Sequence, residues 1–509
     1  MRARIRTLGG ATAVLVGMSV LGLPGGALAA APGQPGTPRY SAGASGAGDA
    51  YFPFAGNGGY DVQHYDLDIR YAPPEATVPP TPTAQLRGQL EAVATIDLVA
   101  TQDLDRFNLD LRGMDVSALA VNGKPASEVP PSAPGAEVEG AAYWQVQDDA
   151  ARIWELTIQP RPKLKAGESA RVVVTYGGET IRPTDIEGVL YGWVTTRDGA
   201  MVVNEPEGSM TWYPVSDHPT DKATYSYEIT VPEGKTAVAN GLPPAPPVTA
   251  DGWTTWFWEA PDLQASYLAT ASVGDFDLRT SETSTGLPII DAVDRKLTAA
   301  ALATTNASLA LQADMIAFLE DNFGDYPFNS YGSIVDNDSV GYALETQTRP
   351  VYSSRAVEST VLHELAHQWL GNAVSPARWQ DIWLNEGWAT YAEWMWEDHT
   401  GGTTAQEAFD DFMTRPANDP YWEVVIADPG PFGLFLGQIY DRGAATLHAL
   451  RTKVGDSAFF AGAQEWVSRY DDSAATTEDF QAVYEEVSGQ ELDAFFDIWL
   501  RNPVKPANW

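Results

Sequence analysis

Two histidines with metal-ligand spacing stand in the segment HELAHQWLGN, residues 363–372. His363 and His367 are two of only six histidines in the 509-residue chain. Residues four positions apart lie on one face of an α-helix, so both imidazoles can point at a common centre. Neutral imidazole binds zinc, and in this motif the glutamate after the first histidine lies beside the metal's water, where it can take a proton. The pattern predicts a zinc site with Glu364 as general base.

A third ligand is needed, because two histidines alone do not hold a zinc ion tightly. We expect a carboxylate from a second helix. The segment WLNEGWATYAEW supplies Glu386, nineteen residues beyond His367 and at the start of an apolar helical segment. A His-Glu-x-x-His string also arises by chance on polar surface helices, but the downstream NEGWA favours the metal site. The predicted centre is one Zn2+ held by His363, His367 and Glu386.

The elements that must position these residues change character along the chain. Up to about Ser272, apolar and polar residues alternate, which is typical of strands. The clearest such segments are YDVQHYDLDI, QLEAVATIDL, RFNLDL, ARVVVTY and YSYEITV. After about Gly274 the apolar residues take helical spacing, and we predict helices over 297–324, 356–373, 387–399, 438–453, 477–488 and 491–500. The predicted fold class is α+β and multidomain, with a β-rich domain over 51–275 and a mainly α domain over 276–509.

The amino terminus has the pattern of an export signal. Arg2, Arg4 and Arg6 precede an apolar run and then GGALAAAPG, which predicts a signal peptide over 1–31 and a secreted, extracellular protein. The alternative is a membrane anchor, but the run is short for a bilayer span. Residues 32–50 are rich in Gly, Pro, Ser and Ala and predict a flexible lead-in. We expect no membrane span in the mature chain.

Charge and cysteine content exclude several classes of function. The formal net charge is −37, so the surface repels phosphate backbones and nucleic acid is not an expected partner. This charge fits solubility outside the cell and, less strongly, a field that favours cationic substrates. The chain has no cysteine, which excludes disulfides, thiolate ligands and cysteine nucleophiles.

Several segments together resemble the M1 family of zinc aminopeptidases, which are gluzincins similar to aminopeptidase N and leukotriene A4 hydrolase. The histidine pair and NEGWA match the family's zinc motif. The segments YDVQHYDLDI, WYPVSDHPTDKATYSYEITVP, ASYLATASVGDFDL and FLEDNFGDYPF resemble family segments in the family's order. The resemblance covers nearly all of the mature chain. It implies a thermolysin-like zinc catalytic domain after the β-rich domain, in a short secreted bacterial type.

The resemblance also assigns residues to the substrate's amine and to catalysis. In GYALETQTRP, Glu345 takes the glutamate position of the family's amine-binding motif, and Thr346 replaces its usual asparagine. In NEPEGSMTWYP, Glu205 takes the place where the family carries Gln or Glu. In IYDRGAATLHALR, Tyr440 takes the position of the tyrosine that stabilises the oxyanion.

These residues predict a zinc-dependent aminopeptidase that removes N-terminal residues from peptides with a free N-terminus. One alternative is a zinc endopeptidase of thermolysin type, which shares the metal residues but does not need Glu345. The other is a non-catalytic peptide-binding protein of the same fold. A monomer is favoured over an oligomer.

Overall fold

A large, mainly antiparallel sheet forms the first half of the protein in the computed structural model, which describes residues 40–78, 80–132 and 140–509. Within these ranges the sheet has twelve strands in the order β1-β4-β8-β7-β6-β5-β9-β3-β2-β12-β15-β14. Their bounds are β1 Ser41–Ala42, β2 Tyr60–Ala72, β3 Gly88–Ala100, β4 Leu104–Asp110, β5 Asp115–Val121, β6 Lys124–Glu128, β7 Ala141–Asp148, β8 Ile153–Gln159, β9 Ser169–Thr180, β12 Ala223–Pro232, β14 Val248–Ala250 and β15 Trp253–Gln264. A second sheet has the order β10-β11-β16-β13, formed by β10 Gly192–Thr195, β11 Ala200–Val203, β13 Thr236–Ala239 and β16 Ala271–Gly274. We call this part the strand half.

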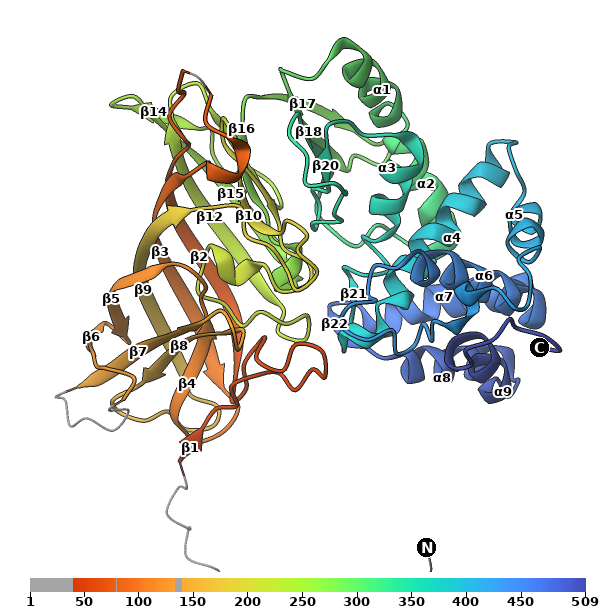
Figure 1. The fold of residues 1–509 in the computed structure, drawn as a ribbon, viewed down its shortest axis with the longest axis horizontal. Coiled ribbons are helices and arrows are strands. Elements are labelled where there is room, and N and C mark those ends of the chain that lie inside the picture. The colour runs from red at the N-terminus through yellow and green to blue at the C-terminus, as the bar shows by residue number, and fades with distance from the viewer. Residues whose placement is uncertain (1–39, 79, 133–139) are drawn as a thin grey trace, which may run out of the picture. The chain divides into compact units, whose positions relative to one another are not determined.

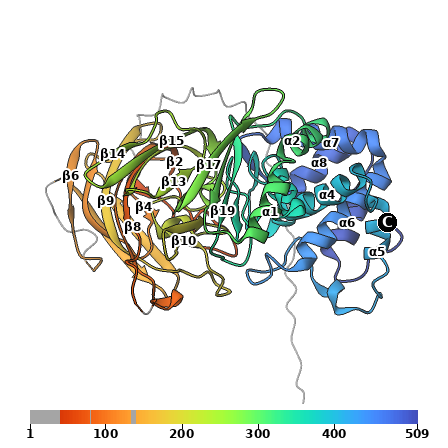
Figure 2. The same ribbon diagram turned by 90° about the horizontal axis from the view of Figure 1, so that it is seen from above.

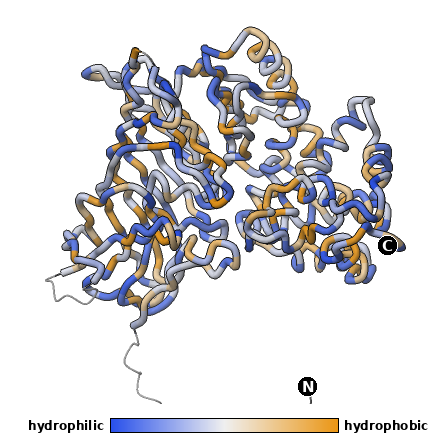
Figure 3. Tube along the Cα trace, in the orientation of Figure 1, coloured by the Kyte–Doolittle hydropathy of each residue, from blue (hydrophilic) through white to orange (hydrophobic). Residues whose placement is uncertain are grey.

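Alternation of side chains explains why the predicted strands form. In β2, Leu67 and Ile69 are fully buried while Asp66 and Asp68 are exposed. β2 pairs antiparallel with β3 and parallel with β12, so its apolar face meets the apolar faces of both neighbours. Orange and blue stretches follow one another along these strands in Figure 3. The sequence prediction of a β-rich first domain is confirmed.

Residues ahead of β2 correct one prediction. The predicted signal peptide, 1–31, lies outside the described residues, and the predicted flexible lead-in, 32–50, is described from residue 40 on. There β1 pairs with β4, and the carboxylate of Asp49 accepts hydrogen bonds from the backbone N–H groups of Tyr51 at 2.7 Å and Trp379 at 2.9 Å. Residues 40–50 are therefore packed on the protein, and the prediction of flexibility is wrong for them.

A mixed sheet and a set of helices follow, which we call the helical half (Figures 1 and 2). The sheet has the order β17-β18-β19-β20, and a two-stranded sheet joins β21 and β22. The strand bounds are β17 Phe276–Glu282, β18 Pro288–Asp294, β19 Tyr331–Asp336, β20 Val351–Ser353, β21 Val374–Pro376 and β22 Ser473–Ala475. The helices are α1 Ala299–Leu309, α2 Gln312–Phe323, α3 Glu358–Ala366, α4 Trp383–His399, α5 Ala405–Phe412, α6 Gly437–Val454, α7 Asp456–Tyr470, α8 Thr477–Ser488 and α9 Asp493–Phe496. Short helical turns lie at Thr83–Gln85, Ser209–Thr211, Ser266–Leu268, Trp379–Asp381, Pro420–Glu423 and Asp497–Arg501.

The predicted domain boundary after residue 275 falls between β16 and β17, which belong to different sheets. Among the predicted helices only that over 477–488 has the predicted bounds; α4 begins at Trp383, four residues before its predicted start, and two others differ more in kind. The helix over 297–324 is divided into α1 and α2, and the side chain of Gln312, at the start of α2, donates to Asp291 of β18 at 3.0 Å and to Ser333 of β19 at 2.9 Å. The helix over 356–373 ends at Ala366, after which Gly371 at φ +142° turns the chain towards β21. Helices α5 and α7 are not among the predicted ranges.

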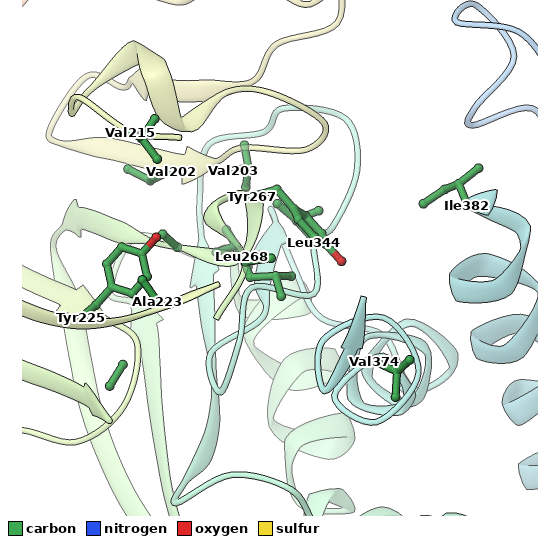
Figure 4. Close-up of a cluster of buried hydrophobic side chains, with 14 of the residues drawn as sticks. Val202, Val203, Val215, Ala223, Tyr225, Tyr267, Leu268, Leu344, Val374 and Ile382 are labelled. Atoms are coloured by element: carbon green, nitrogen blue, oxygen red, sulfur yellow. The ribbon is translucent and has the colours of Figure 1, made fainter. Parts of the chain in front are cut away.

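One continuous hydrophobic core joins the two halves. Figure 4 shows part of it, where Val202, Val203 and Tyr225 of the strand half lie in the same cluster as Leu344 and Val374 of the helical half. Polar contacts join the halves as well. Lys222 donates to the carbonyls of Asn372 and Ala373, each at 2.8 Å. None of the helices in the described part of the chain is long and apolar enough to cross a membrane.

Two acidic residues face one another across β4 and β8 inside the strand half. Asp110 pairs with Glu155 in the strand register and accepts hydrogen bonds from the backbone N–H groups of Gly56 and Asp217. Glu155 is 5% exposed, and neither of its carboxylate oxygens has a partner among the described residues. Burial raises the pKa of Glu155 to about 8, and burial together with the charge of Glu155 raises the pKa of Asp110 well above its usual value, although two backbone N–H groups stabilise the Asp110 anion.

Candidate active site

Helices α3 and α4 bring the three predicted metal ligands together. Val361 and Leu365 are fully buried and fix α3, which leaves His363 on the opposite side of the helix and His367 at its carboxyl end. Glu386 lies in the first turn of α4. One carboxylate oxygen of Glu386 is 3.1 Å from Nε2 of His363 and 3.4 Å from Nε2 of His367. One ligand atom from each of the three residues lies within 4.8 Å of the others.

Outer contacts orient both imidazoles for metal binding. Nδ1 of His363 is 2.8 Å from the carboxylate of Glu393, and Nδ1 of His367 is 3.2 Å from the carbonyl of Leu370. Both partners accept hydrogen bonds, so both Nδ1 atoms carry the proton and each Nε2 presents its lone pair to the common centre. Two imidazoles and a carboxylate with this orientation fit a catalytic zinc ion.

Electrostatics keep Glu386 ionised. Burial alone would raise its pKa, but when both imidazoles are protonated at Nε2 as well, their hydrogen bonds and charges outweigh burial and hold the pKa at about 2. Glu393 was not singled out from the sequence. It follows Glu386 by seven residues on the same helix, two turns further on and so on the same face, and this spacing could have identified it.

Glu364 and Tyr440 lie beside this centre. The Glu364 side chain is 5% exposed, and burial, partly offset by the two histidines, raises its pKa to about 8. The Tyr440 ring stacks on the His363 ring with centroids 6.0 Å apart and 26° between the planes. Burial and the nearby carboxylates raise the pKa of Tyr440 well above its usual value, so its hydroxyl stays protonated and can donate a hydrogen bond.

A close contact between α4 and α6 sets the place of Tyr440 relative to Glu386. Gly387 follows Glu386, and Gly443 comes three residues after Tyr440. An ideal Cβ on Gly443 would lie 2.7 Å from Cα of Gly387, and one on Gly387 would lie 2.9 Å from Cα of Gly443. The two backbones therefore touch where only glycines fit.

The two predicted amine-binding acids, Glu345 and Glu205, are buried in the same place. They are 2% and 8% exposed, and Oε1 of each has no hydrogen-bond partner among the described residues. An oxygen of Glu345 lies within 4.8 Å of ligand atoms of Glu364 and His367. Burial raises the pKa of both acids, and for Glu205 the charge of Glu345 raises it further.

The segment that follows α3 holds the segment of Glu345 in position. The side chain of Gln368 donates to the backbone carbonyl of Glu345 at 3.2 Å, and the side chain of Asn372 donates to the same carbonyl at 2.7 Å. Thr346, which departs from the family pattern, donates instead to the carbonyl of Arg349 at 2.5 Å. Neither Gln368 nor Asn372 was predicted as a site residue.

All seven residues singled out from the sequence line one cavity of about 690 Å3. They are Glu205, Glu345, His363, Glu364, His367, Glu386 and Tyr440. The cavity also contacts residues that sequence reasoning missed. These are Asp185, Glu187, Val189, Val340, Gly341, Tyr342, Ala343, Thr360, Glu393 and Phe435.

A strand-rich half that precedes a helical half, with a buried histidine pair and a distant glutamate at one centre, defines a two-domain protein of the metallopeptidase class. Comparison with known families agrees with this class. Residues 62–268 match the Peptidase M1 N-terminal domain, and residues 311–499 match the Peptidase family M1 domain. The chain belongs to peptidase family M1.

Individual relatives and solved structures are also similar to this chain. Glutamyl aminopeptidase of Bitis rhinoceros is 26% identical over 388 residues, which cover 67% of this chain and 40% of the relative. Aminopeptidase N of Lactococcus lactis subsp. lactis is 26% identical over 324 residues, 58% of this chain and 38% of the relative. The chain thus spans less than half the length of these relatives. An M1 zinc metallopeptidase from Deinococcus radiodurans has a TM-score of 0.77 at 27% identity, over 91% of this chain and 99% of that one.

Proposed function

We propose that this protein is a zinc-dependent aminopeptidase that removes N-terminal residues from peptides with a free amine. The observation that carries the proposal is the pair of buried, unpartnered oxygens of Glu205 and Glu345 in the cavity of the metal-ligand set. A buried polar atom without a partner is costly, and a substrate ammonium would supply the missing donors. The same ammonium would relieve the repulsion between the two carboxylates.

His363, His367 and Glu386 would hold the zinc ion. When bound, zinc lowers the pKa of a water molecule and polarises the carbonyl of the peptide bond. Glu364 takes the proton of the attacking water and passes it to the leaving amine.

Tyr440 donates its hydroxyl hydrogen to the oxygen that becomes negative on the carbonyl carbon. Its stacking on the His363 ring supports this assignment, because it places the phenol beside the centre where the charge develops. Glu205 and Glu345 fix the position of the ammonium, so that the first peptide bond is the one presented to Glu364 and Tyr440. This arrangement makes the enzyme an exopeptidase.

The names of two relatives support aminopeptidase activity, because the proteins compared above are called glutamyl aminopeptidase and aminopeptidase N. One solved structure of the Deinococcus radiodurans metallopeptidase, in a variant form, contains a Tyr-Ser-Ala substrate, and it is 28% identical to this chain over 91% of its length with a TM-score of 0.77. We extend peptide substrates to this chain on that basis. We also propose export from a bacterial cell, which is supported by the basic and apolar leader in residues 1–31.

The rival function is a zinc endopeptidase of thermolysin type. It would use the same metal ligands and Glu364, but it would not explain why Glu205 and Glu345 are buried in the cavity without hydrogen-bond partners. A protein that only binds peptides would need neither Glu364 nor Tyr440.

The test uses the purified protein, a tripeptide with a free amine and product analysis by mass spectrometry. Glu364→Gln should retain zinc, measured by elemental analysis, and lose turnover by about 10^3-fold, because only the proton acceptor is removed. A chelator should abolish the activity of the unchanged protein, and added zinc should restore it. Normal turnover in the variant, or turnover that resists the chelator, would remove this site as the centre of the reaction.

A further inference from the structure

A rigid turn in the strand half carries two carboxylates to the wall of the active-site cavity. We call residues 184–190 the acidic turn. Thr184 and Leu190 form an antiparallel bridge at its base. Oδ1 of Asp185 accepts hydrogen bonds from the backbone N–H groups of Glu187 and Val189, each at 2.8 Å. These bonds fix the conformation of the turn.

Contacts at both ends of the acidic turn hold it in place. The Arg112 guanidinium donates to the carbonyl of Thr184 at 3.3 Å, and the Tyr342 hydroxyl donates to the carbonyl of Leu190 at 2.8 Å. Tyr342 lies on the segment that leads to Glu345. Burial and then the charges of Glu205, Asp185 and Glu345 raise the pKa of Tyr342 well above its usual value. The turn therefore lies at the end of the cavity where the amine would bind.

No lysine or arginine balances the carboxylates that line the cavity, among the residues that the structure describes. Among the described residues, the cavity lining includes seven carboxylates. Four of these seven carboxylates have a role in the proposed reaction. Glu386 binds the metal, Glu364 transfers the proton, and Glu205 and Glu345 bind the amine. Glu393 orients His363. Asp185 and Glu187 remain, and neither forms an ion pair with Lys, Arg or His in the described part of the chain.

We propose that the acidic turn makes this cavity selective for peptides whose N-terminal residue carries a cationic side chain, lysine or arginine. The inference rests on the proposed aminopeptidase function and adds the class of substrate. With the amine held by Glu205 and Glu345, a long side chain of the same residue lies at the end of the cavity that Asp185 and Glu187 line. Charge of one sign in a cavity with low-dielectric walls attracts the opposite charge and repels its own. An N-terminal aspartate or glutamate is therefore the worst fit.

The experiment compares tripeptides X-Ala-Ala in which X is arginine, its neutral isostere citrulline, leucine or glutamate. We expect kcat/KM for arginine to exceed that for citrulline by about 10-fold at low salt, with glutamate lowest. The preference should shrink as salt is raised, because salt screens the charges of Glu187, which is exposed, and Asp185, which is partly buried. Binding of L-arginine and L-citrulline is measured by calorimetry on the same protein, as a readout that needs no turnover.

Two variants test the turn itself. Glu187→Gln should lower the arginine to citrulline ratio several-fold and leave zinc content and leucine turnover unchanged. Asp185→Asn with Glu187→Gln should lower it further, while the amide oxygen of the asparagine still accepts from the turn. The matched control is Glu233→Gln, which removes one exposed charge in the turn after β12, away from the cavity, and should leave the ratio unchanged.

The outcomes separate this inference from the function on which it rests. Aminopeptidase turnover without an arginine preference, or with a preference for glutamate, overturns the inference and leaves the function. Tighter binding of arginine than of citrulline without any turnover overturns the function and supports the selectivity. Equal binding and no turnover overturn both.

Discussion

Substitution of Gly443 by alanine tests whether the contact between α4 and α6 positions the catalytic tyrosine. The added Cβ would lie 2.7 Å from Cα of Gly387 and 3.3 Å from its nitrogen. Carbon atoms in contact normally stand about 3.5–4.0 Å apart, so the two backbones must separate by up to about 1 Å. Glu386 and Tyr440 lie on these two helices and would move apart with them.

The expected cost has two parts. Overpacking of this kind destabilises a protein by about 1–3 kcal/mol, which thermal unfolding detects as a lower Tm. A displacement of about 1 Å at a catalytic group can cost roughly 10^2-fold in turnover. We therefore expect Gly443→Ala to lose between about 10-fold and 100-fold in kcat/KM at a temperature where the variant is still folded.

The matched control is Gly437→Ala on the same helix. A Cβ at Gly437 meets no atom within 4 Å, and alanine is the better helix former by up to about 1 kcal/mol. This variant should keep full turnover and an equal or higher Tm. If Gly443→Ala behaves like Gly437→Ala in both assays, the helix contact does not position the site and our reasoning about Tyr440 is wrong.

Three further predictions concern single residues. Glu393→Gln should weaken zinc binding by about 10–100-fold in a competition with a chelator, because the amide no longer orients His363 as a carboxylate does; unchanged affinity would show that the contact is incidental. Tyr440→Phe should lower kcat by about 10^2-fold or more with little change in KM or zinc content, since the hydroxyl acts only when charge develops; a change in KM alone would assign it to binding. Glu155→Gln should stabilise the protein at pH 8 by about 1–3 kcal/mol and have no effect at pH 4. Since the folded pKa of Glu155, about 8, lies above the ordinary glutamate value of 4.5, the unchanged protein loses stability as pH rises through that interval and the variant does not. Melting curves across pH measure this difference, and a constant difference would contradict it.

The metal centre was predictable because its signal is local. His363 and His367 share one helix face by spacing alone, and Glu386 stands at the head of the next apolar helix. The strands were predictable for the same reason, as the alternation in β2 shows. Glu205 and Glu345 required the resemblance to the family, because nothing in the residues around them distinguishes a buried acid from an exposed one.

The features of the fold and site that were not predicted depend on contacts between segments that are distant in the sequence. The acidic turn reaches the cavity only because the strand half packs against the segment of Tyr342, which the sequence does not show. Strands β18 and β19 are almost entirely buried and so lack the alternation that identifies β2. The division between α1 and α2 has no glycine or proline to mark it, and the contact of Gln312 with the sheet joins residues that are distant in the sequence. Residues 40–50 have the composition of a linker, yet β-pairing and the buried Asp49 hold them in place.

The central claim is that a zinc site acts beside an amine clamp, by which we mean Glu205 and Glu345, the two acids that bind the substrate's amine. The most direct test is cleavage of one short peptide and of its N-acetylated twin, each with and without a zinc chelator. We predict that only the free-amine peptide is cleaved, one residue at a time from its N-terminus, and that the chelator abolishes the reaction. Cleavage of both peptides at internal bonds would contradict the amine clamp of Glu205 and Glu345 and would establish an endopeptidase instead.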